Sequence, residues 1–311
     1  MRPSPSSSAR RTLSSSLPAL TYRSRSTSTF RRGGSRRVES WFRLPCRGIG
    51  LAYGRTSPRR TMVRSLPWSN TLPVGDAAVL IEFGQVLDVA ANARVLLATR
   101  MAQRLLADGA LPGVWGTIPS YNTLLIEFDP LATTRDAVLA ALRSALMQGG
   151  DETIAGRRFR VPVWYAGEDL PEVAARTGLT VDEVITLHAA VDFRIFTVGF
   201  APGQPICGML PDALRLPRRG SPRVAVPPRS VALGGHQVTI YPTASPGGFH
   251  LLGRTPVVPF NLERIPPVLW APGDVLRFYP IGREQYEHLA AAFATGEEML
   301  APEPPGSALL A

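Results

Sequence analysis

The chain has 311 residues, 45% of them apolar, which is enough to bury the cores of about two domains. The net charge of +10 is unevenly divided, because residues 1–61 carry fourteen arginines and one acid while residues 62–311 carry 20 arginines and 23 acids. Residues 62–311 are thus slightly acidic. Their charge predicts neither a nucleic-acid nor a membrane partner. The chain contains no lysine, which excludes a complete Walker-type phosphate loop, Schiff-base chemistry and biotin attachment.

The first segment of the chain is rich in arginine and serine and shows no hydrophobic periodicity. This composition predicts a disordered extension over residues 1–65. A transit peptide, or an arginine-rich arm that binds nucleic acid, would have the same composition. We favour a third interpretation, in which translation starts at Met62, because an ordered pattern begins soon after this residue.

Residues 66–160 are predicted to form a small α/β domain. Buried apolar runs alternate with segments of helical periodicity, and Gly84, Gly109 and the Gly149-Gly150 pair end three of them. The order of strand, helix, strand, strand, helix and a last strand is typical of a ferredoxin-like layer. The predicted elements are strand 77–83, helix 88–108, strands 114–118 and 123–128, helix 133–147 and strand 159–164.

Two short helices are predicted next, over residues 170–177 and 180–190, with Gly178 between them. This spacing is similar to that of a DNA-binding helix-turn-helix. The second helix contains no arginine and carries Asp182 and Glu183, which would repel phosphates. We therefore predict a pair of packing helices.

Residues 161–290 are predicted to form a β-rich domain, followed by a loose tail over residues 291–311. The stretch 199–259 contains nine glycines and eleven prolines, with short apolar runs between them. Many short strands between glycine and proline turns are typical of a β-barrel or sandwich. The chain as a whole is therefore predicted to have an α+β fold.

The β-rich domain contains a long run without acids, from Asp212 to Glu263. Arginine forks bind carboxylates and phosphates, and glycine turns let backbone amides approach an anion. The run therefore favours a site for a small anionic substrate, although a solvated basic face is the better explanation for any single arginine. Its basic residues are Arg215, Arg218, Arg219, Arg223, Arg229, Arg254, His236 and His250.

One loop in this run, Ser245 to His250, combines a hydroxyl group, two adjacent glycines and an imidazole. Such a loop could hold an oxyanion, and a tight turn with a surface histidine explains it equally well. The four histidines are far apart and neither cysteine has a partner at zinc spacing, so we expect no metal. Two unrelated cysteines and no apolar run of 18 residues favour a protein of the cytoplasm without a membrane span.

A series of different short motifs lies along residues 74–285. They are Gly75-Asp76-Ala77, Pro119-Ser120-Tyr121, Glu183-Val184-Ile185-x-Leu187-His188, Gly199-Phe200-Ala201-Pro202-Gly203, Leu216-Pro217-Arg218-Arg219, Pro222-Arg223-Val224, Ile240-Tyr241-Pro242, Ser245-Pro246-Gly247-Gly248, Leu252-Gly253-Arg254-Thr255, Pro272-Gly273-Asp274 and Phe278-Tyr279-Pro280-Ile281. This set resembles the family of the 5-oxoprolinase B-subunit, which includes the sporulation kinase inhibitor KipI and allophanate hydrolase subunit 1.

The resemblance implies an N-terminal ferredoxin-like α/β domain followed by a C-terminal cyclophilin-like β-barrel. It also implies an ATP-dependent opening of 5-oxo-L-proline to L-glutamate, carried out together with a homologous C-subunit and an A-subunit of the 5-oxoprolinase complex. Because the chain has no lysine, ATP is expected at a site shared with these partners. Two alternatives remain: a KipI-like inhibitor of a histidine kinase, and a carboxyltransferase or allophanate hydrolase type of protein that acts on another small amide.

Mapped by motif, the resemblance implies a cleft with candidate catalytic residues His250 and Arg254. His250 would transfer a proton and Arg254 would bind the substrate anion. The chain departs from the family at Gln204-Pro205-Ile206-Cys207-Gly208, where a run like Phe-Pro-Tyr-Leu-Gly is usual, and at His236-Gln237-Val238-Thr239, where Gln-Thr-Gly is common. These departures bear on the substrate more than on the fold. The candidate substrate-binding residues are Arg219, Gln237, Tyr241, Ser245, Gly247 and Gly248.

Overall fold

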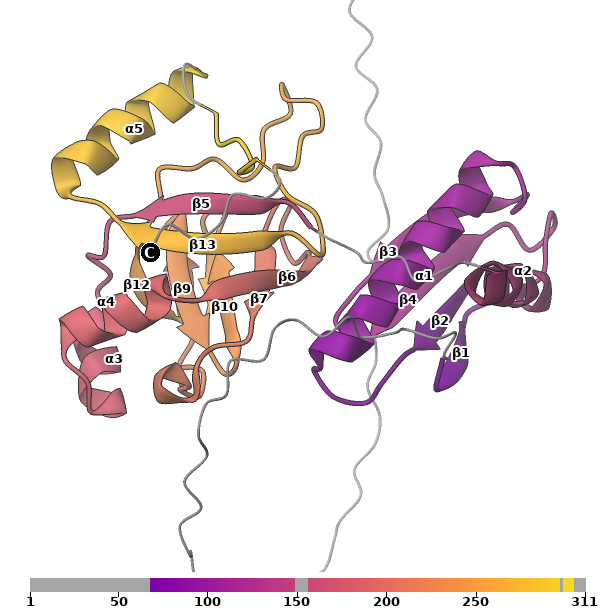
Figure 1. The fold of residues 1–311 in the computed structure, drawn as a ribbon, viewed down its shortest axis with the longest axis horizontal. Helices are drawn as coiled ribbons and strands as arrows, with labels where there is room; N and C mark the ends of the chain where they lie inside the picture. Colours follow the sequence, from indigo (N-terminus) through magenta and orange to yellow (C-terminus); the bar gives the residue numbers. More distant parts are fainter. Residues whose placement is uncertain (1–67, 149–155, 297–298, 305–311) are drawn as a thin grey trace, which may run out of the picture. The chain divides into compact units, whose positions relative to one another are not determined.

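The computed structural model of the protein describes residues 68–148, 156–296 and 299–304 (Figure 1). The predicted extension over residues 1–65 lies outside these residues. Part of the predicted tail is helical, because helix α5 (Arg283–Thr295) continues past residue 291. No helix in the described ranges is both long and apolar enough to cross a lipid bilayer.

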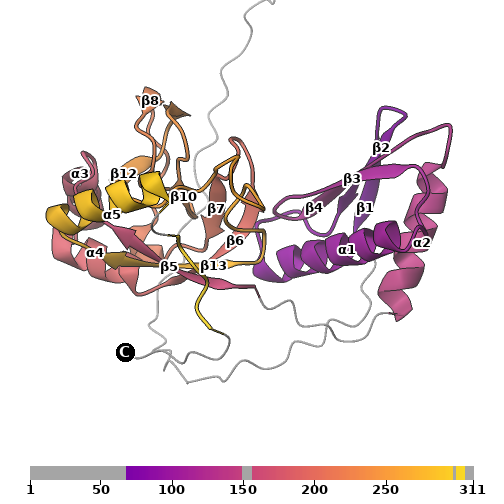
Figure 2. The same cartoon turned by 90° about the horizontal axis from the view of Figure 1, so that it is seen from above.

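The first domain is a four-stranded antiparallel sheet with two helices packed against one face (Figure 2). Alternate residues of the two central strands are fully buried against these helices, as the two-residue period of a strand requires. The strands lie in the order β1 (Asn70–Val74), β2 (Ala78–Glu82), β4 (Thr123–Phe128) and β3 (Val114–Pro119), and the helices are α1 (Val89–Ala107) and α2 (Arg135–Gln148).

The ferredoxin-like prediction is wrong in one respect, the last strand. The strand predicted at residues 159–164 is β5 (Arg158–Val163), and it pairs with the second sheet. The edge of the first sheet is formed by β1 instead, which makes a tight hairpin with β2. Gly75 takes the left-handed conformation that this turn needs, with φ of 62°. Pro73 concealed the strand from sequence reasoning, since proline is tolerated only at a sheet edge.

The second domain is a seven-stranded sheet that curls into a nearly closed barrel. Neighbouring strands are antiparallel except β13 and β5, which are parallel. The two edges meet through a backbone pair in which Trp164 and Arg254 exchange two N–H···O bonds of 2.9 Å. In spatial order the strands are β12 (His250–Arg254), β9 (Ser230–Gly234), β10 (Gln237–Ile240), β7 (Pro205–Gly208), β6 (Asp192–Val198), β13 (Val275–Pro280) and β5.

The helix pair α3 (Leu170–Thr177) and α4 (Val181–Ala189) packs on this barrel, as the sequence predicted. Gly178 ends α3 in the left-handed conformation, and Thr180 caps α4 through a reciprocal capping box. Both helices bury apolar residues in the barrel core. The remaining elements are a short 3₁₀ turn, η1 (Asp212–Leu214), and a two-stranded ribbon of β8 (Arg223–Val226) and β11 (Ser245–Gly247).

Candidate ligand-binding cavity

A cavity of about 560 Å³ lies beside the barrel, in the size range of small-molecule sites. Most of its wall is apolar, aromatic or glycine. Arg218 is the only charged side chain among the described residues that line it. The lining residues are Ile118, Pro119, Ser120, Tyr121, Thr197, Val198, Gly199, Phe200, Gln204, Ile206, Arg218, Pro222, Thr239, Tyr241, Pro246, Gly247, Gly248 and Phe249.

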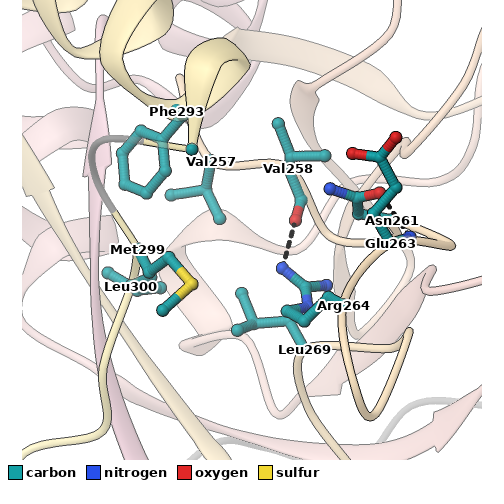
Figure 3. Close-up of a pocket in the computed structure, with 10 residues that line it drawn as sticks. Val257, Val258, Asn261, Glu263, Arg264, Leu269, Phe293, Met299 and Leu300 are labelled. Carbon is teal, nitrogen blue, oxygen red and sulfur yellow. Dashed lines mark hydrogen bonds between the residues drawn. The ribbon is translucent and has the colours of Figure 1, made fainter.

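A second, smaller pocket of about 150 Å³ is lined largely by apolar side chains such as Val257, Phe293 and Leu300 (Figure 3). Its arginine, Arg264, is already engaged with the protein. The guanidinium donates to the carbonyl oxygen of Val258, as Figure 3 shows, and to further carbonyls of the same loop. This cation therefore stabilises the loop, and the pocket is a weaker candidate for a ligand site than the larger cavity.

Tyr241 and the glycines of the predicted loop are part of the wall of the larger cavity. The Tyr241 side chain is 3% exposed, burial raises the pKa of its phenol, and the backbone N–H of Phe249 donates to it. A side chain at Gly247 would collide with this phenol, because a β-carbon there would lie 2.3 Å from the hydroxyl oxygen. Gly248 has more room, with its nearest neighbour at 3.7 Å. The structure thus brings these three predicted residues together in one wall.

Arg218 presents its positive charge at this cavity. Its guanidinium carbon lies 4.8 Å from the centre of the Phe249 ring, and its Nη2 donates to Oε1 of Gln237 over 3.3 Å. Among the described residues no carboxylate forms an ion pair with Arg218. The ring and the amide hold the side chain in place, and the fork remains available for an anion. Gln237 therefore acts on the site through Arg218.

The neighbouring Arg219, which the sequence favoured, is used by the fold. Its Nη1 donates to Oδ1 of Asp169 over 2.8 Å and to Oε2 of Glu172 over 3.3 Å. Asp169 also accepts hydrogen bonds from Arg223 and from the backbone N–H of Leu251. Burial opposes the ionisation of Asp169, but these hydrogen bonds and the two arginine charges outweigh it and lower the pKa of the carboxyl group. Arg219 thus anchors helix α3 to the barrel.

His250, Arg254 and Ser245 also lie outside the cavity lining. The His250 ring is fully buried, and its Nε2 donates to the carbonyl oxygen of Pro217 over 2.9 Å. The backbone of Arg254 closes the barrel, while its side chain donates to the Pro228 carbonyl. The hydroxyl of Ser245 is buried without a hydrogen-bond partner among the described residues. In this arrangement the catalytic roles expected for His250 and Arg254 stay untested predictions, and the contacts of both residues are structural.

Among the polar lining residues, Tyr121, Gln204 and Thr239 were not candidates from the sequence, and Arg218 was named only as a member of the basic run. Tyr121 lies in the turn between β3 and β4, burial raises the pKa of its phenol, and a hydrogen bond with Gln237 opposes that shift. The motif Pro119-Ser120-Tyr121 was a signal for this turn, but nothing in it placed the turn beside the barrel. No group of three metal-ligating side chains occurs in the part of the chain that the structure describes. Cys207 is buried, and burial raises the pKa of its thiol.

Comparison with known proteins identifies the family. Residues 69–270 match the carboxyltransferase domain, subdomain C and D. The chain is 36% identical over 215 residues to the 5-oxoprolinase B-subunit of Escherichia coli O157:H7, which covers 67% of this chain and 94% of that protein. It is 30% identical over 227 residues to the 5-oxoprolinase B-subunit of Bacillus subtilis, covering 68% of this chain and 93% of that protein.

Solved structures show the same fold. TTHA0988 superimposes with a TM-score of 0.59 at 37% identity, over 66% of this chain and 40% of TTHA0988, so this chain spans less than half of that protein. Urea carboxylase of Kluyveromyces lactis gives a TM-score of 0.58 at 19% identity, over 76% of this chain and 25% of that one, which shows a shared fold alone. The chain belongs to the carboxyltransferase-domain family, subdomains C and D, that includes the proteins named as B-subunits of 5-oxoprolinase.

Proposed function

We propose that this chain is the B-subunit of an ATP-dependent 5-oxoprolinase, which opens 5-oxo-L-proline to L-glutamate together with a homologous C-subunit and an A-subunit. Relatives that bear the B-subunit name match the chain over 94% and 93% of their own lengths. A carboxyltransferase type of activity on another small amide is supported less, since a putative urea carboxylase of Emericella nidulans is 24% identical and only 21% of it is matched.

The observation that carries the substrate assignment is the cavity with a single cation and no acid in its described lining. 5-Oxo-L-proline is a small ring with one carboxylate. A guanidinium fork at Arg218 can bind this carboxylate with two parallel hydrogen bonds. The apolar wall around Phe249 and Ile206 suits the methylene groups of the ring.

We assign ATP to a site shared with the partner subunits, because the chain has no lysine for a phosphate loop. The fold in this proposal is a cyclophilin-like barrel with a small α/β domain before it, which the nearly closed seven-stranded sheet supports. We place the protein in the cytoplasm, where a free buried thiol such as Cys207 is expected.

The proposal is tested by reconstitution. The purified chain alone is expected to hydrolyse neither ATP nor 5-oxoproline, and 5-oxoproline-dependent ATP hydrolysis is expected once the A- and C-subunits are added. Within that complex Arg218→Ala should lower kcat/KM about ten- to a hundredfold, because a charged hydrogen bond contributes roughly 1.5–3 kcal/mol. Arg218→Lys should restore little, since an ammonium group lacks the planar fork.

Arg215→Ala is the matched control, because Arg215 lies in the same basic run but pairs with Asp212 outside the cavity. Its kcat/KM should stay within about twofold of wild type, since exposed ion pairs contribute little. Melting temperature and co-purification with the partners should be the same for both variants. An Arg218→Ala complex with wild-type kcat/KM would contradict the proposal that Arg218 binds the substrate carboxylate. Robust turnover by the chain alone would contradict the proposal that the ATP site is shared with the partner subunits.

A further inference from the structure

Phe200 differs from the buried aromatic residues of the cavity because it is open to solvent. The residue belongs to the cavity lining, yet it is 78% exposed. An aromatic ring left in water forgoes the stabilisation that burial of its apolar surface would give. A lining residue with this exposure lies at the mouth of the cavity, where its ring is accessible both to solvent and to a molecule that enters.

The backbone of Phe200 is also in an unfavourable conformation. Its φ is 72°, in the left-handed region that glycine enters without a steric cost. For a bulky residue this conformation is a genuine outlier, and it persists only where the surrounding structure imposes it. Strained residues of this kind cluster at ligand-binding sites. Exposure and strain are two independent observations, and both concern a residue of the cavity lining.

The turn formed by residues 199–204 holds this backbone in place. The backbone N–H groups of Gly199 and Gln204 both donate to carbonyl oxygens within the turn, each over 3.0 Å. Nε1 of Trp270 donates to the carbonyl oxygen of Gly203 over 2.9 Å, which ties the turn to the barrel core. With the backbone fixed, the motion left to the aromatic residue is rotation of its ring about the side-chain bonds.

We propose that Phe200 is a ligand-contacting residue, whose ring covers the apolar face of a small cyclic carboxylate bound at Arg218. Both residues line the same cavity. The ring loses its contact with water when the ligand is bound, so its burial contributes to affinity. A rigid ring packs on an aromatic face at a smaller entropic cost than a flexible chain, so the contact favours cyclic carboxylates over open ones. The inference rests on the proposed function for the identity of the substrate.

Two probes that share a five-membered ring and a carboxylate test the inference. 5-Oxo-L-proline carries a lactam, and cyclopentanecarboxylate has the ring alone. Binding is measured by calorimetry on the full chain and on the reconstituted complex. Phe200→Ala and Phe200→Gly should each weaken the binding of both probes at least about fivefold, because the ring that covers the ligand is gone. Phe200→Tyr keeps the ring and should bind both within about twofold of wild type.

Thermal unfolding separates this role from a structural one. Phe200→Gly relieves the strain and removes a side chain that is exposed, so it should melt at the wild-type temperature or a few degrees higher. Leu131→Ala is the matched control, since Leu131 is 96% exposed and lies outside the cavity lining. It should bind both probes within about twofold of wild type. A Phe200→Gly protein that melts clearly below wild type would overturn the inference, because the ring would then be part of the fold.

Unchanged binding of both probes by Phe200→Ala and Phe200→Gly would also overturn the inference, and so would a wild-type protein that binds neither probe. It would be overturned as well if these variants bound the probes normally but no longer co-purified with the partner subunits. The ring would then be a contact between proteins.

The two proposals fail in different ways. If the binding of cyclopentanecarboxylate depends on Phe200 but 5-oxoproline neither binds nor turns over, the role of Phe200 stands and the 5-oxoprolinase assignment falls. If 5-oxoproline turns over in the complex with the same kcat/KM in wild type and Phe200→Gly, the assignment stands and the role of Phe200 falls.

Discussion

At the scale of single residues, His188 shows how burial controls charge. Its ring is fully buried, with ring centres 4.7 Å from Phe278 and 5.2 Å from Phe193. Nδ1 forms a hydrogen bond of 2.7 Å with the hydroxyl of Tyr165. Burial lowers the pKa of His188 from 6.5 to about 3, because the charged form would lose its hydration. The native protein therefore holds this imidazole neutral.

This burial predicts a loss of stability in mild acid. Below about pH 6.5 the unfolded chain binds a proton at His188 that the native state refuses, so the free energy of unfolding falls by about 1.4 kcal/mol per pH unit until the pH nears the native pKa. His188→Phe keeps an aromatic ring and removes the proton. Between pH 7 and pH 5, wild type should lose about 2 kcal/mol more than this variant in urea unfolding. Equal losses would contradict the assignment of a neutral buried imidazole.

The residues of the site were predictable only where the signal was local. Gly247 and Gly248 are adjacent in one short motif, and both lie in the cavity wall. Which of the two arginines, Arg218 or Arg219, is available for a ligand depends on Asp169. This carboxylate lies fifty positions before Arg219 and binds it. No local pattern carries that pairing, because the helix that holds Asp169 reaches the arginine only after the barrel has formed.

At the scale of elements, barrel closure depends on a close approach of two backbones. The pair Trp164 and Arg254 joins the ends of β5 and β12. A β-carbon at Gly253 would lie 2.3 Å from the carbonyl oxygen of Trp164, and one at Gly167 would lie 2.2 Å from the carbonyl oxygen of Leu251. Both positions of this seam, the place where the ends of β5 and β12 meet, therefore require glycine, because any side chain would collide with the opposite backbone.

Gly253→Ala should therefore open the seam and lower the free energy of unfolding by about 3 kcal/mol, the upper part of the range for overpacking. Gly220→Ala is the control, since no atom lies within 4 Å of a β-carbon there. It should change stability by less than about 1 kcal/mol. Thermal or urea unfolding of the two variants measures the difference, and equal stabilities would show that the seam is not close-packed.

Predicted elements were accurate where hydrophobic period and breakers coincided. The helix expected at residues 88–108 is α1 (Val89–Ala107), and the strand expected at 77–83 is β2 (Ala78–Glu82). The partner of β5 could not be predicted in the same way. A buried apolar strand shows by its composition that it belongs in a core, but not which of two sheets will receive it.

At the scale of the whole molecule, the net charge is concentrated in one part of the chain. Residues 1–61 contribute +13 to the net charge and the remainder contributes −3. The family match begins at residue 69. The charge that would attract polyanions thus belongs to a segment outside the matched domain.

A chain that starts at Met62 should have the same melting temperature as the full chain and the same activity in the complex. It should also lose retention on a cation exchanger at pH 7, because its net charge is −3 instead of +10. The measurements are thermal unfolding, turnover in the complex and elution by salt. A clear fall in melting temperature or in partner binding would show that the arginine-rich segment contributes to the fold or the assembly.

The parallel pairing of β13 with β5 also fixes an order of events during synthesis. Arg158 pairs with Val275, which the ribosome adds 117 positions later. At about 5–20 residues per second this delay lasts about 6 to 23 s. Throughout it β5 has an open edge, and open edges of apolar strands pair with other chains. A nascent chain halted before Val275 lacks β13, so it cannot complete its barrel and should aggregate more readily than the finished chain.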